Sequence, residues 1–144
     1  MSTSTADQQM WSQLAGLYGR IEARLGVAVQ RGHGIGLSEY RALEQLSTNM
    51  YGELRMQELA DRIGLNQSSV TRLVGRLASS GLALRDTCPN DGRGVYAVIT
   101  AEGRAKLRAA RSDYAKALAE ALDEAGPLAD ALRSAFAATV ITDE

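Results

Sequence analysis

The stretch Leu59–Gly81, with the sequence LADRIGLNQSSVTRLVGRLASSG, decides the fold of this chain. Its second half, read as a helix from Gln67, repeats apolar residues at steps of three and four, which places them on one buried stripe. These apolar residues are Val70, Leu73, Val74 and Leu77. The opposite face carries hydroxyl side chains and arginines, with no acidic residue between Asn66 and Ser80. Such a face suits an approach to phosphates and base edges.

The residues before that helix predict a turn and a shorter helix. Leu59 and Ile63 belong to the inner face of the short helix, and Gly64 stands where a left-handed helix exit is easiest. Asn66 is a good N-cap, because its side-chain oxygen accepts a free backbone N–H. Helix, glycine turn and capped helix make a helix-turn-helix unit, whose second helix enters the major groove. An ordinary helical hairpin shares this local pattern, but the acid-free face of residues 67–80 favours the DNA-reading interpretation.

A β-hairpin is predicted directly behind the second helix. Leu82–Arg85 and Val95–Ile99 are short apolar runs that flank a tip rich in Pro, Asn, Asp and Gly. A hairpin behind a recognition helix is a wing, with its outer part at residues 86–95. Arg93 lies between two glycines at the tip, and an arginine there suits the minor groove, whose negative potential attracts it.

The run from Met56 to Leu107 closely resembles the MarR family of bacterial winged-helix regulators. The most specific pieces are SSVTRLVGRL at 68–77, DGRG at 91–94 and VITAEG at 98–103. Leu37–Leu43 also resembles the helix that precedes the family's reading head. The resemblance implies a mainly α fold with a small β-hairpin wing, that is, a winged helix-turn-helix plus a helical dimerisation region.

The resemblance also implies a homodimeric repressor or activator, with a repressor favoured, that binds a palindromic operator in double-stranded DNA. Members of the family are often released from DNA by a small aromatic or phenolic ligand. In this interpretation, helix 67–80 reads the major groove and Asp91 holds Arg93 by an ion pair at the wing tip. The residues expected to contact DNA are Gln67, Ser68, Ser69, Thr71, Arg72, Arg76, Asp91 and Arg93. Two positions depart from the family pattern: Arg55 stands near a usual hydroxyl cap, and Gly94 where a second basic residue often follows the wing arginine.

Both ends of the chain are predicted to be helices. Their apolar stripes are too long for a winged helix alone to bury. An apolar stripe runs from about Asp7 to Gln30, and another helix begins after Thr100, a plausible N-cap, and ends near Gly126-Pro127. A last short helix follows. We therefore expect a second copy of the chain to cover these stripes. The expected domains are residues 37–100 for DNA binding, and residues 1–36 with 101–144 for dimerisation.

A small ligand wedged between a helical base and a reading head would change the spacing of two recognition helices, if its affinity differs between the two spacings. The side chains expected near such a cleft are Trp11, Tyr18, His33 and Tyr40. His33 lies in the sequence GHGIG, which predicts a flexible loop. The alternative is a place in the dimer core for Trp11 and Tyr18, and a solvated loop position for His33.

Composition limits the remaining classes. A chain of 144 residues has the size of a single domain with a moderate core. It contains no apolar run of roughly 18 residues that would suggest a membrane helix, and its start, MSTSTADQQ, lacks the features of a signal peptide. The single cysteine, Cys88, excludes an internal disulfide, so we expect a cytoplasmic protein. A redox role for Cys88 is left open.

With one histidine and one cysteine, the sequence predicts no metal cluster, no cofactor and no catalytic constellation. We therefore expect no enzyme activity, which argues against a small metabolic enzyme working as an all-helical dimer. A second alternative is a winged-helix protein-interaction module without sequence-specific DNA binding. The acid-free helix face argues against it.

The formal net charge of −1 is not the basic footprint of a typical DNA-binding protein. The charge is uneven, however. From Ala117 onward the chain has six acidic residues and one basic residue, Arg133. In contrast, Leu65–Val95 has four arginines and two acidic residues, Asp86 and Asp91. Because phosphate binding depends on local charge, the acidic balance away from the proposed reading surface does not count against DNA binding.

Overall fold

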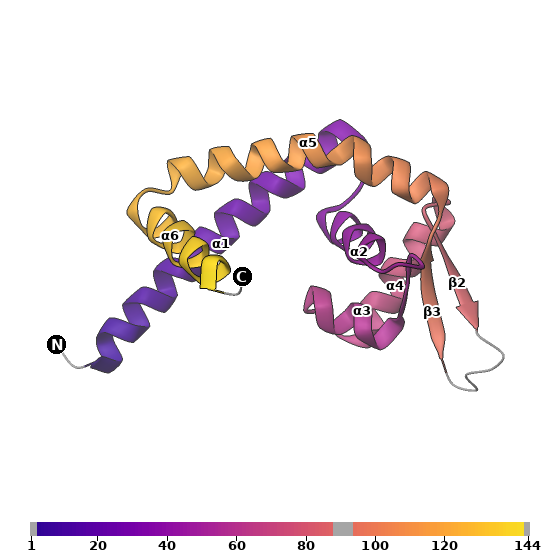
Figure 1. Ribbon diagram of the computed structural model, residues 1–144, viewed down its shortest axis with the longest axis horizontal. Coiled ribbons are helices and arrows are strands. Elements are labelled where there is room, and N and C mark those ends of the chain that lie inside the picture. The colour runs from indigo at the N-terminus through magenta and orange to yellow at the C-terminus, as the bar shows by residue number, and fades with distance from the viewer. Residues whose placement is uncertain (1–2, 88–93, 143–144) are drawn as a thin grey trace. The chain divides into compact units, whose positions relative to one another are not determined.

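The computed structural model describes residues 3–87 and 94–142 of the chain. Figure 1 shows the order of its helices and strands along the chain. Their bounds are α1 (Thr3–His33), α2 (Leu37–Thr48), β1 (Glu53–Arg55), α3 (Met56–Ile63), α4 (Gln67–Ser79), β2 (Ala83–Thr87), β3 (Val95–Ile99), α5 (Ala101–Glu124) and α6 (Pro127–Thr142). The chain forms two units, which we call the winged unit (Val29–Ser112) and the helical unit (Met1–Ala28 with Asp113–Glu144).

The winged unit packs α2, α3 and α4 with a three-stranded antiparallel sheet of order β1-β3-β2. In the register of the sheet, Ala97 of β3 lies between Leu54 of β1 and Arg85 of β2. The mainly helical fold with a small β wing is confirmed. The short strand β1 was not predicted, because its three residues acquire strand structure only by pairing with β3.

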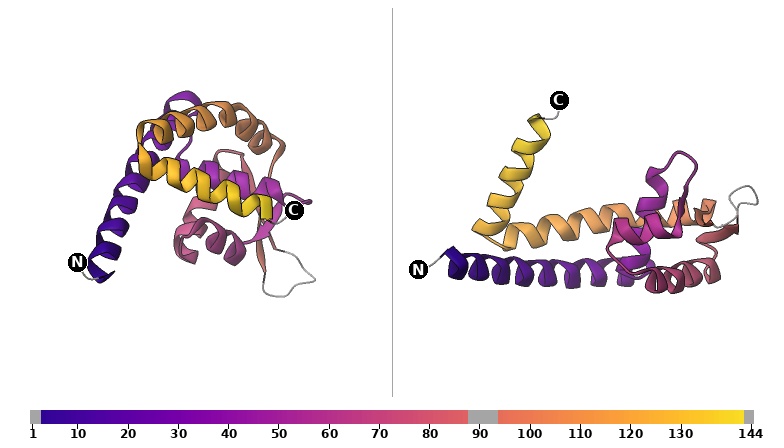
Figure 2. Two further views of the ribbon diagram at one scale, coloured as in Figure 1. Left: turned by 60° about the vertical axis from the view of Figure 1, so that its left-hand side comes forward. Right: turned by 90° about the horizontal axis from the view of Figure 1, so that it is seen from below.

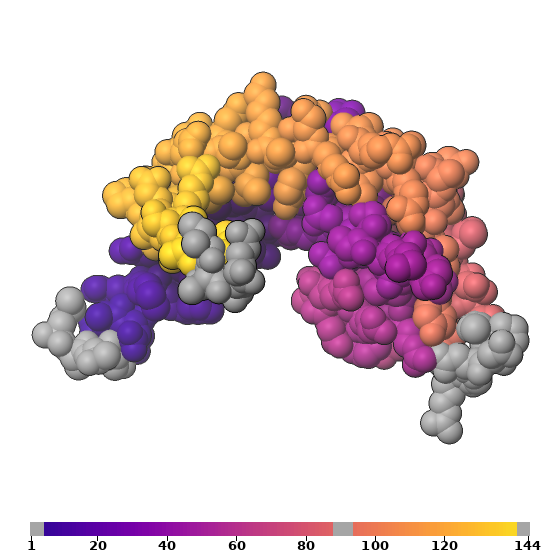
Figure 3. Space-filling model, in the orientation of Figure 1, coloured from indigo at the N-terminus to yellow at the C-terminus, as the bar shows by residue number. Residues whose placement is uncertain are grey.

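The core of the winged unit is closed by the apolar stripes of its helices. The largest fully buried side chains of α2, α3 and α4 are Tyr40, Leu43, Leu46, Leu59, Val70, Leu73, Val74 and Leu77. The two helices α2 and α3 pack against each other, and Figure 3 shows their atoms, in purple and magenta, in contact at the surface. Burial of one such Leu or Val stabilises the fold by about 1.5–3 kcal/mol before entropy is subtracted. This core holds the backbone of α4 in place.

Local signals fix how α3, α4 and α5 begin and end. Gly64 adopts φ +72° after α3, which is the left-handed exit expected of it. The side chain of Asn66 accepts the backbone N–H of Ser69 at 2.8 Å, which confirms the predicted N-cap of α4. The side chain of Thr100 accepts the backbone N–H of Gly103 at 3.0 Å at the start of α5, as expected.

In the helical unit, α1 and the second half of α5 lie side by side (Figure 2). Arg24 of α1 pairs with Glu120 at 3.5 Å and with Glu124 at 2.6 Å. Leu17 and Leu25 of α1 are buried. Many of the unit's large apolar side chains are exposed, namely Met10, Trp11, Tyr18, Val27, Leu132, Phe136 and Val140.

The prediction of a loop at His33 is wrong. α1 continues past Gln30 and includes His33, and it ends where Gly34 takes φ +69° and donates its N–H to the carbonyl of Gln30 at 3.0 Å. Lys106 of α5 donates to the carbonyl of His33 at 3.1 Å, which satisfies one carbonyl of the last turn. A tertiary contact therefore extends the helix beyond its sequence pattern.

Candidate nucleic-acid interface

The face of α4 that points away from the core carries the polar residues that the sequence singled out. Val70, Leu73, Val74 and Leu77 are each fully buried. Helical residues three and four apart share a face. Because these four residues bury one face of α4, the residues between them in the sequence point to solvent. Gln67, Ser68, Thr71, Arg72 and Arg76 are exposed, and Ser69 is half-buried. The structure thus brings six of the expected DNA-contacting residues together on one helix.

Hydrogen bonds fix several of these side chains within α4. The carboxamide oxygen of Asn66 accepts the hydroxyl of Ser68 at 2.8 Å in addition to the Ser69 N–H. The hydroxyl of Thr71 donates to the carbonyl of Gln67 at 2.9 Å, so toward a further partner its oxygen remains an acceptor. Arg72 donates from Nη2 to the hydroxyl of Ser69 at 3.3 Å. The exposed arginine and hydroxyl groups are therefore partly ordered in the free protein.

Arg76 differs from Arg72 because a carboxylate faces it. Its Nε lies 3.5 Å from Oε1 of Glu39, which stands in the first turn of α2. The side chain of Arg76 is 58% exposed and that of Glu39 only 20%. Glu39 was not among the expected contacts, because no local pattern indicates that α2 brings a carboxylate to the acid-free face of α4.

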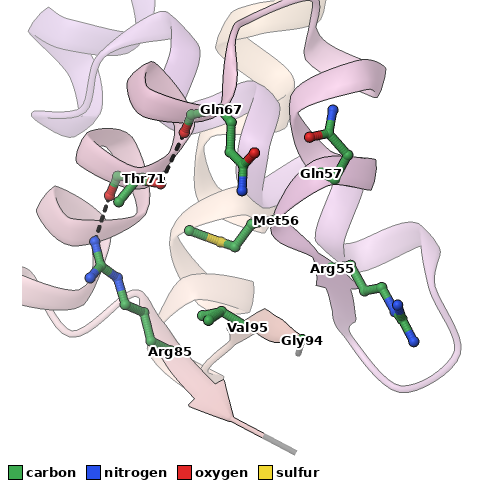
Figure 4. Close-up of a pocket in the computed structure, with 8 residues that line it drawn as sticks. All are labelled: Arg55, Met56, Gln57, Gln67, Thr71, Arg85, Gly94 and Val95. Carbon is green, nitrogen blue, oxygen red and sulfur yellow. Dashed lines mark hydrogen bonds between the residues drawn. The ribbon is translucent and has the colours of Figure 1, made fainter. Parts of the chain in front are cut away.

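The wing contacts α4 through Arg85 of β2. Its Nη2 donates to the backbone carbonyl of Thr71 at 2.6 Å, as Figure 4 shows. Gly75 lies one turn further along α4, and a Cβ on it would stand 3.3 Å from the same Nη2. The glycine therefore leaves the space through which the arginine reaches α4. Arg85 was counted among the four arginines of Leu65–Val95, but its contact with α4 was not foreseen.

A basic pocket of about 270 Å³ lies between α3, α4 and the wing. Arg55, Gln57, Gln67, Thr71 and Arg85 supply its polar lining. Figure 4 shows Gln67 and Arg85 on the side of Met56 and Val95, whereas the Arg55 guanidinium is directed away from them. Arg55 makes no cap for α3, as its departure from the family pattern suggested. Its Nε instead donates to the hydroxyl of Tyr96 at 3.1 Å, with the guanidinium over the ring.

The expected wing-tip contacts fall outside the described residues. This holds for Asp91 and Arg93, whose ion pair stays a prediction, and for Cys88.

The four expected effector contacts divide between the two units. Trp11 and Tyr18 of the helical unit are 67% and 61% exposed. In the winged unit, His33 is half-buried and Tyr40 is only 1% exposed. A ligand would reach the Tyr40 side chain only after the core around it had opened. Their role as effector contacts therefore stays a prediction.

Two kinds of feature are absent from the described residues. No group of three His, Cys, Asp or Glu side chains in residues 3–87 and 94–142 is arranged to hold a metal ion. Within the same ranges, no helix has both the length and the apolar character needed to cross a bilayer.

Known proteins share this arrangement. Residues 33–94 match the model of the MarR family. The chain is 30% identical over 95 residues to YkoM of Bacillus subtilis (strain 168), an uncharacterised HTH-type transcriptional regulator. That alignment covers 66% of this chain but only 60% of YkoM, so the chain matches part of its relative's length.

Solved structures extend the likeness over the chain. Sco3205 of Streptomyces coelicolor, a MarR family transcriptional regulator solved in complex with DNA, is 26% identical with a TM-score of 0.81, covering 100% of this chain and 89% of its own. BpsR of Bordetella bronchiseptica, whose DNA binding is regulated by 6-hydroxynicotinic acid, shares the fold at 17% identity, with a TM-score of 0.76 and coverage of 92% and 98%.

The family match spans α2, α3, α4 and β2, the elements that build the acid-free helix face and carry Arg85. Its relatives are regulators of transcription and not enzymes. With the whole-chain likeness to a DNA-bound relative, these findings lead to one conclusion: residues 33–94 form a winged helix of the MarR family of transcriptional regulators, and the whole chain is similar in fold to a member of that family.

Proposed function

We propose that this protein is a homodimeric repressor that reads a palindromic operator in double-stranded DNA. Helix α4 enters the major groove and the wing meets the adjacent minor groove. The observation that carries the proposal is the exposed face of α4, on which Arg72 and Arg76 stand among hydroxyl side chains above a fully buried stripe. The relative Sco3205, solved in complex with DNA, supports the same use of the fold.

The chemistry of the α4 face suits base reading. An arginine that faces a guanine donates two N–H groups to its O6 and N7 atoms, which is the commonest specific contact in the major groove. Hydroxyl side chains such as Ser68 and Thr71 accept or donate to phosphates and to bases. The basic pocket that contains Arg55 and Arg85 adds positive charge beside α4 and suits a backbone phosphate.

The dimer is supported by the exposed apolar side chains of the helical unit. Leu132, Phe136 and Val140 repeat every four residues on α6 and are 42%, 71% and 47% exposed. Trp11 and Tyr18 add two exposed aromatic side chains on α1. An apolar stripe of this kind marks an interaction surface. We assign residues 1–36 and 101–144 to dimerisation and residues 37–100 to DNA binding.

Release by a small aromatic ligand is part of the proposal. Its support is the relative BpsR, whose DNA binding 6-hydroxynicotinic acid regulates, together with the candidate contacts Trp11, Tyr18, His33 and Tyr40. A ligand of this class would act by binding better to one spacing of the two reading heads than to the other. A screen of aromatic acids against the protein–operator complex tests this part. If no compound releases the operator, the protein is an effector-independent repressor.

The central experiment is selection of bound sites from a pool of random duplexes with purified protein. We expect an enriched palindrome with half-sites about one helical turn apart. We also expect the Kd for this site to rise steeply with salt concentration. A pool without enrichment, or binding without salt dependence, would overturn the proposal and favour a protein-interaction module. Placing the selected site across a promoter in a transcription assay then tests repression.

A further inference from the structure

We propose that Glu39 determines the sequence specificity of the reading head by positioning Arg76. This inference rests on the proposed DNA-reading function and assigns a role to a residue of α2, outside the recognition helix. Glu39 touches no base in this proposal. It acts through Arg76, whose Nε lies 3.5 Å from the Glu39 carboxylate.

The carboxylate is held on a rigid support. Glu39 is flanked along α2 by Tyr40, which is 1% exposed, and by Ala42 and Leu43, which are fully buried, so the helix that carries it is anchored in the core. The Glu39 side chain itself is only 20% exposed. A half-buried carboxylate on a fixed helix defines a direction for Arg76, whose longer side chain is 58% exposed and otherwise free to turn.

The geometry of the guanidinium makes this direction useful. The group is planar and carries five N–H donors, one on Nε and four on the two terminal nitrogens. Glu39 faces the Nε end, so the terminal N–H groups stay available for the two parallel hydrogen bonds that a guanine edge accepts. Arg72 lacks such a partner, since its contact in the described chain is the neutral hydroxyl of Ser69. The two arginines of α4 therefore play different parts.

The charge of Glu39 has a second effect. A carboxylate beside the reading face repels phosphates and neutralises one arginine, which weakens binding to any duplex regardless of sequence. Correct pairing of Arg76 with its base restores affinity at the operator alone. Specificity is a difference of affinities, and a group that penalises wrong sites raises it.

The test compares Glu39→Gln with Glu44→Gln in the full-length protein. Glu44 lies on the same helix and makes no ion pair within the described ranges, so it controls for loss of one negative charge from α2. Operator and scrambled duplexes are titrated over a range of salt. For Glu39→Gln we expect scrambled DNA to bind about threefold tighter and the salt slope to steepen by about one per reading head. We expect the ratio of operator to scrambled affinity to fall about five- to tenfold.

A double-mutant cycle separates positioning from a general structural effect. In an Arg76→Ala background the Glu39→Gln effect on the affinity ratio should vanish, whereas in an Arg72→Ala background it should persist. Glu39→Asp keeps the charge and shortens the reach, so it should lower the ratio without tightening binding to scrambled DNA. Thermal unfolding of every variant identifies loss of fold, and Glu39→Asp carries the test if Glu39→Gln unfolds.

The inference is overturned if Glu39→Gln behaves like Glu44→Gln, or if its effect is the same with and without Arg76. These results leave the proposed function intact as long as the wild-type protein selects an operator. A wild-type protein that binds no duplex selectively would instead overturn the proposed function, and the role of Glu39 with it.

Discussion

Both units of this protein contain amphipathic helices, but the apolar stripe is buried in one unit and exposed in the other. In the winged unit, the inner stripe of α4, including Leu73 and Leu77, is fully buried by neighbours in the same chain. In the helical unit, the stripe of Leu132, Phe136 and Val140 on α6 stays exposed. The winged unit does expose apolar side chains, such as Met50 and Tyr51, but these lie in a turn and not along a helix.

An apolar stripe on a helix therefore predicts that the stripe is buried, but not whether the same chain or a second copy covers it. A stripe that the chain itself covers contributes to the stability of a monomer, whereas an uncovered stripe stabilises only an assembly. Substitutions in the two units should therefore be distinguishable by whether their effects depend on protein concentration.

The largest effect is expected at Phe136. Phe136→Asp places a carboxylate in the stripe, and a two-fold interface contains that change twice. We expect the dimer Kd to rise more than about 1,000-fold, so that a native dimer becomes a monomer at micromolar concentration. Sedimentation equilibrium measures this directly. Ser134→Asp, about 200° away around the same helix, is the control and should remain dimeric. A folded wild-type monomer would remove the distinction between the units.

A pair of Leu→Ala substitutions compares the two units directly. Leu73→Ala in the closed core should lower the free energy of unfolding by about 2–5 kcal/mol at any protein concentration, because it leaves a cavity. Leu132→Ala, at a side chain that is 42% exposed, should cost less than about 0.5 kcal/mol when the protein is diluted below its dimer Kd. Urea unfolding at two concentrations provides the measurement. Equal costs at high dilution would contradict the comparison.

Arginines of the two units should differ in their effect on DNA binding. Arg76→Ala should weaken operator binding by about 1–3 kcal/mol if Arg76 reads a base, and preference should relax at one position per half-site. Arg133→Ala removes the same charge from the helical unit, where Arg133 pairs with Asp123 at 2.8 Å, and should leave the operator Kd within about twofold. The idea fails if Arg72 and Arg76 can both become alanine without loss of binding.

The smallest effect is expected at the cap of α4. Asn66→Ala removes the acceptor for the Ser69 N–H and should lower stability by about 1 kcal/mol, whereas Asn66→Ser should restore most of it. Thermal unfolding is the measurement. Since Asn66 also holds the hydroxyl of Ser68, Asn66→Ala should release one side chain of the reading face. An alanine variant as stable as the serine variant would mean that the cap contributes nothing.

Sequence reasoning predicted the elements whose cause is local. The stripe of α4, the Asn66 cap and the Gly64 exit each depend on residues within a few positions of one another, and each is present. Strand β1 and the last turn of α1 were missed, because both depend on distant partners, β3 for the strand and Lys106 for the helix end.

The candidate site divides in the same way. The exposed residues of α4 follow from helical periodicity and were identified in advance. The contacts of Glu39 with Arg76 and of Arg85 with Thr71 join positions 37 and 14 residues apart, and no single-chain pattern indicates them. The chemistry of the reading face was visible in the sequence, whereas the groups that orient it were not.

The approach of Arg85 to α4 has a consequence for how this sequence can evolve. A glycine inside a helix costs up to about 1 kcal/mol relative to alanine, so helix stability alone would favour replacing Gly75. A methyl group there would press on the Arg85 guanidinium at 3.3 Å, and the 2.6 Å bond to Thr71 leaves it little room to retreat. Positions 75 and 85 therefore constrain each other, and a lineage that acquires a branched residue at 75 should first lose or shorten the arginine at 85.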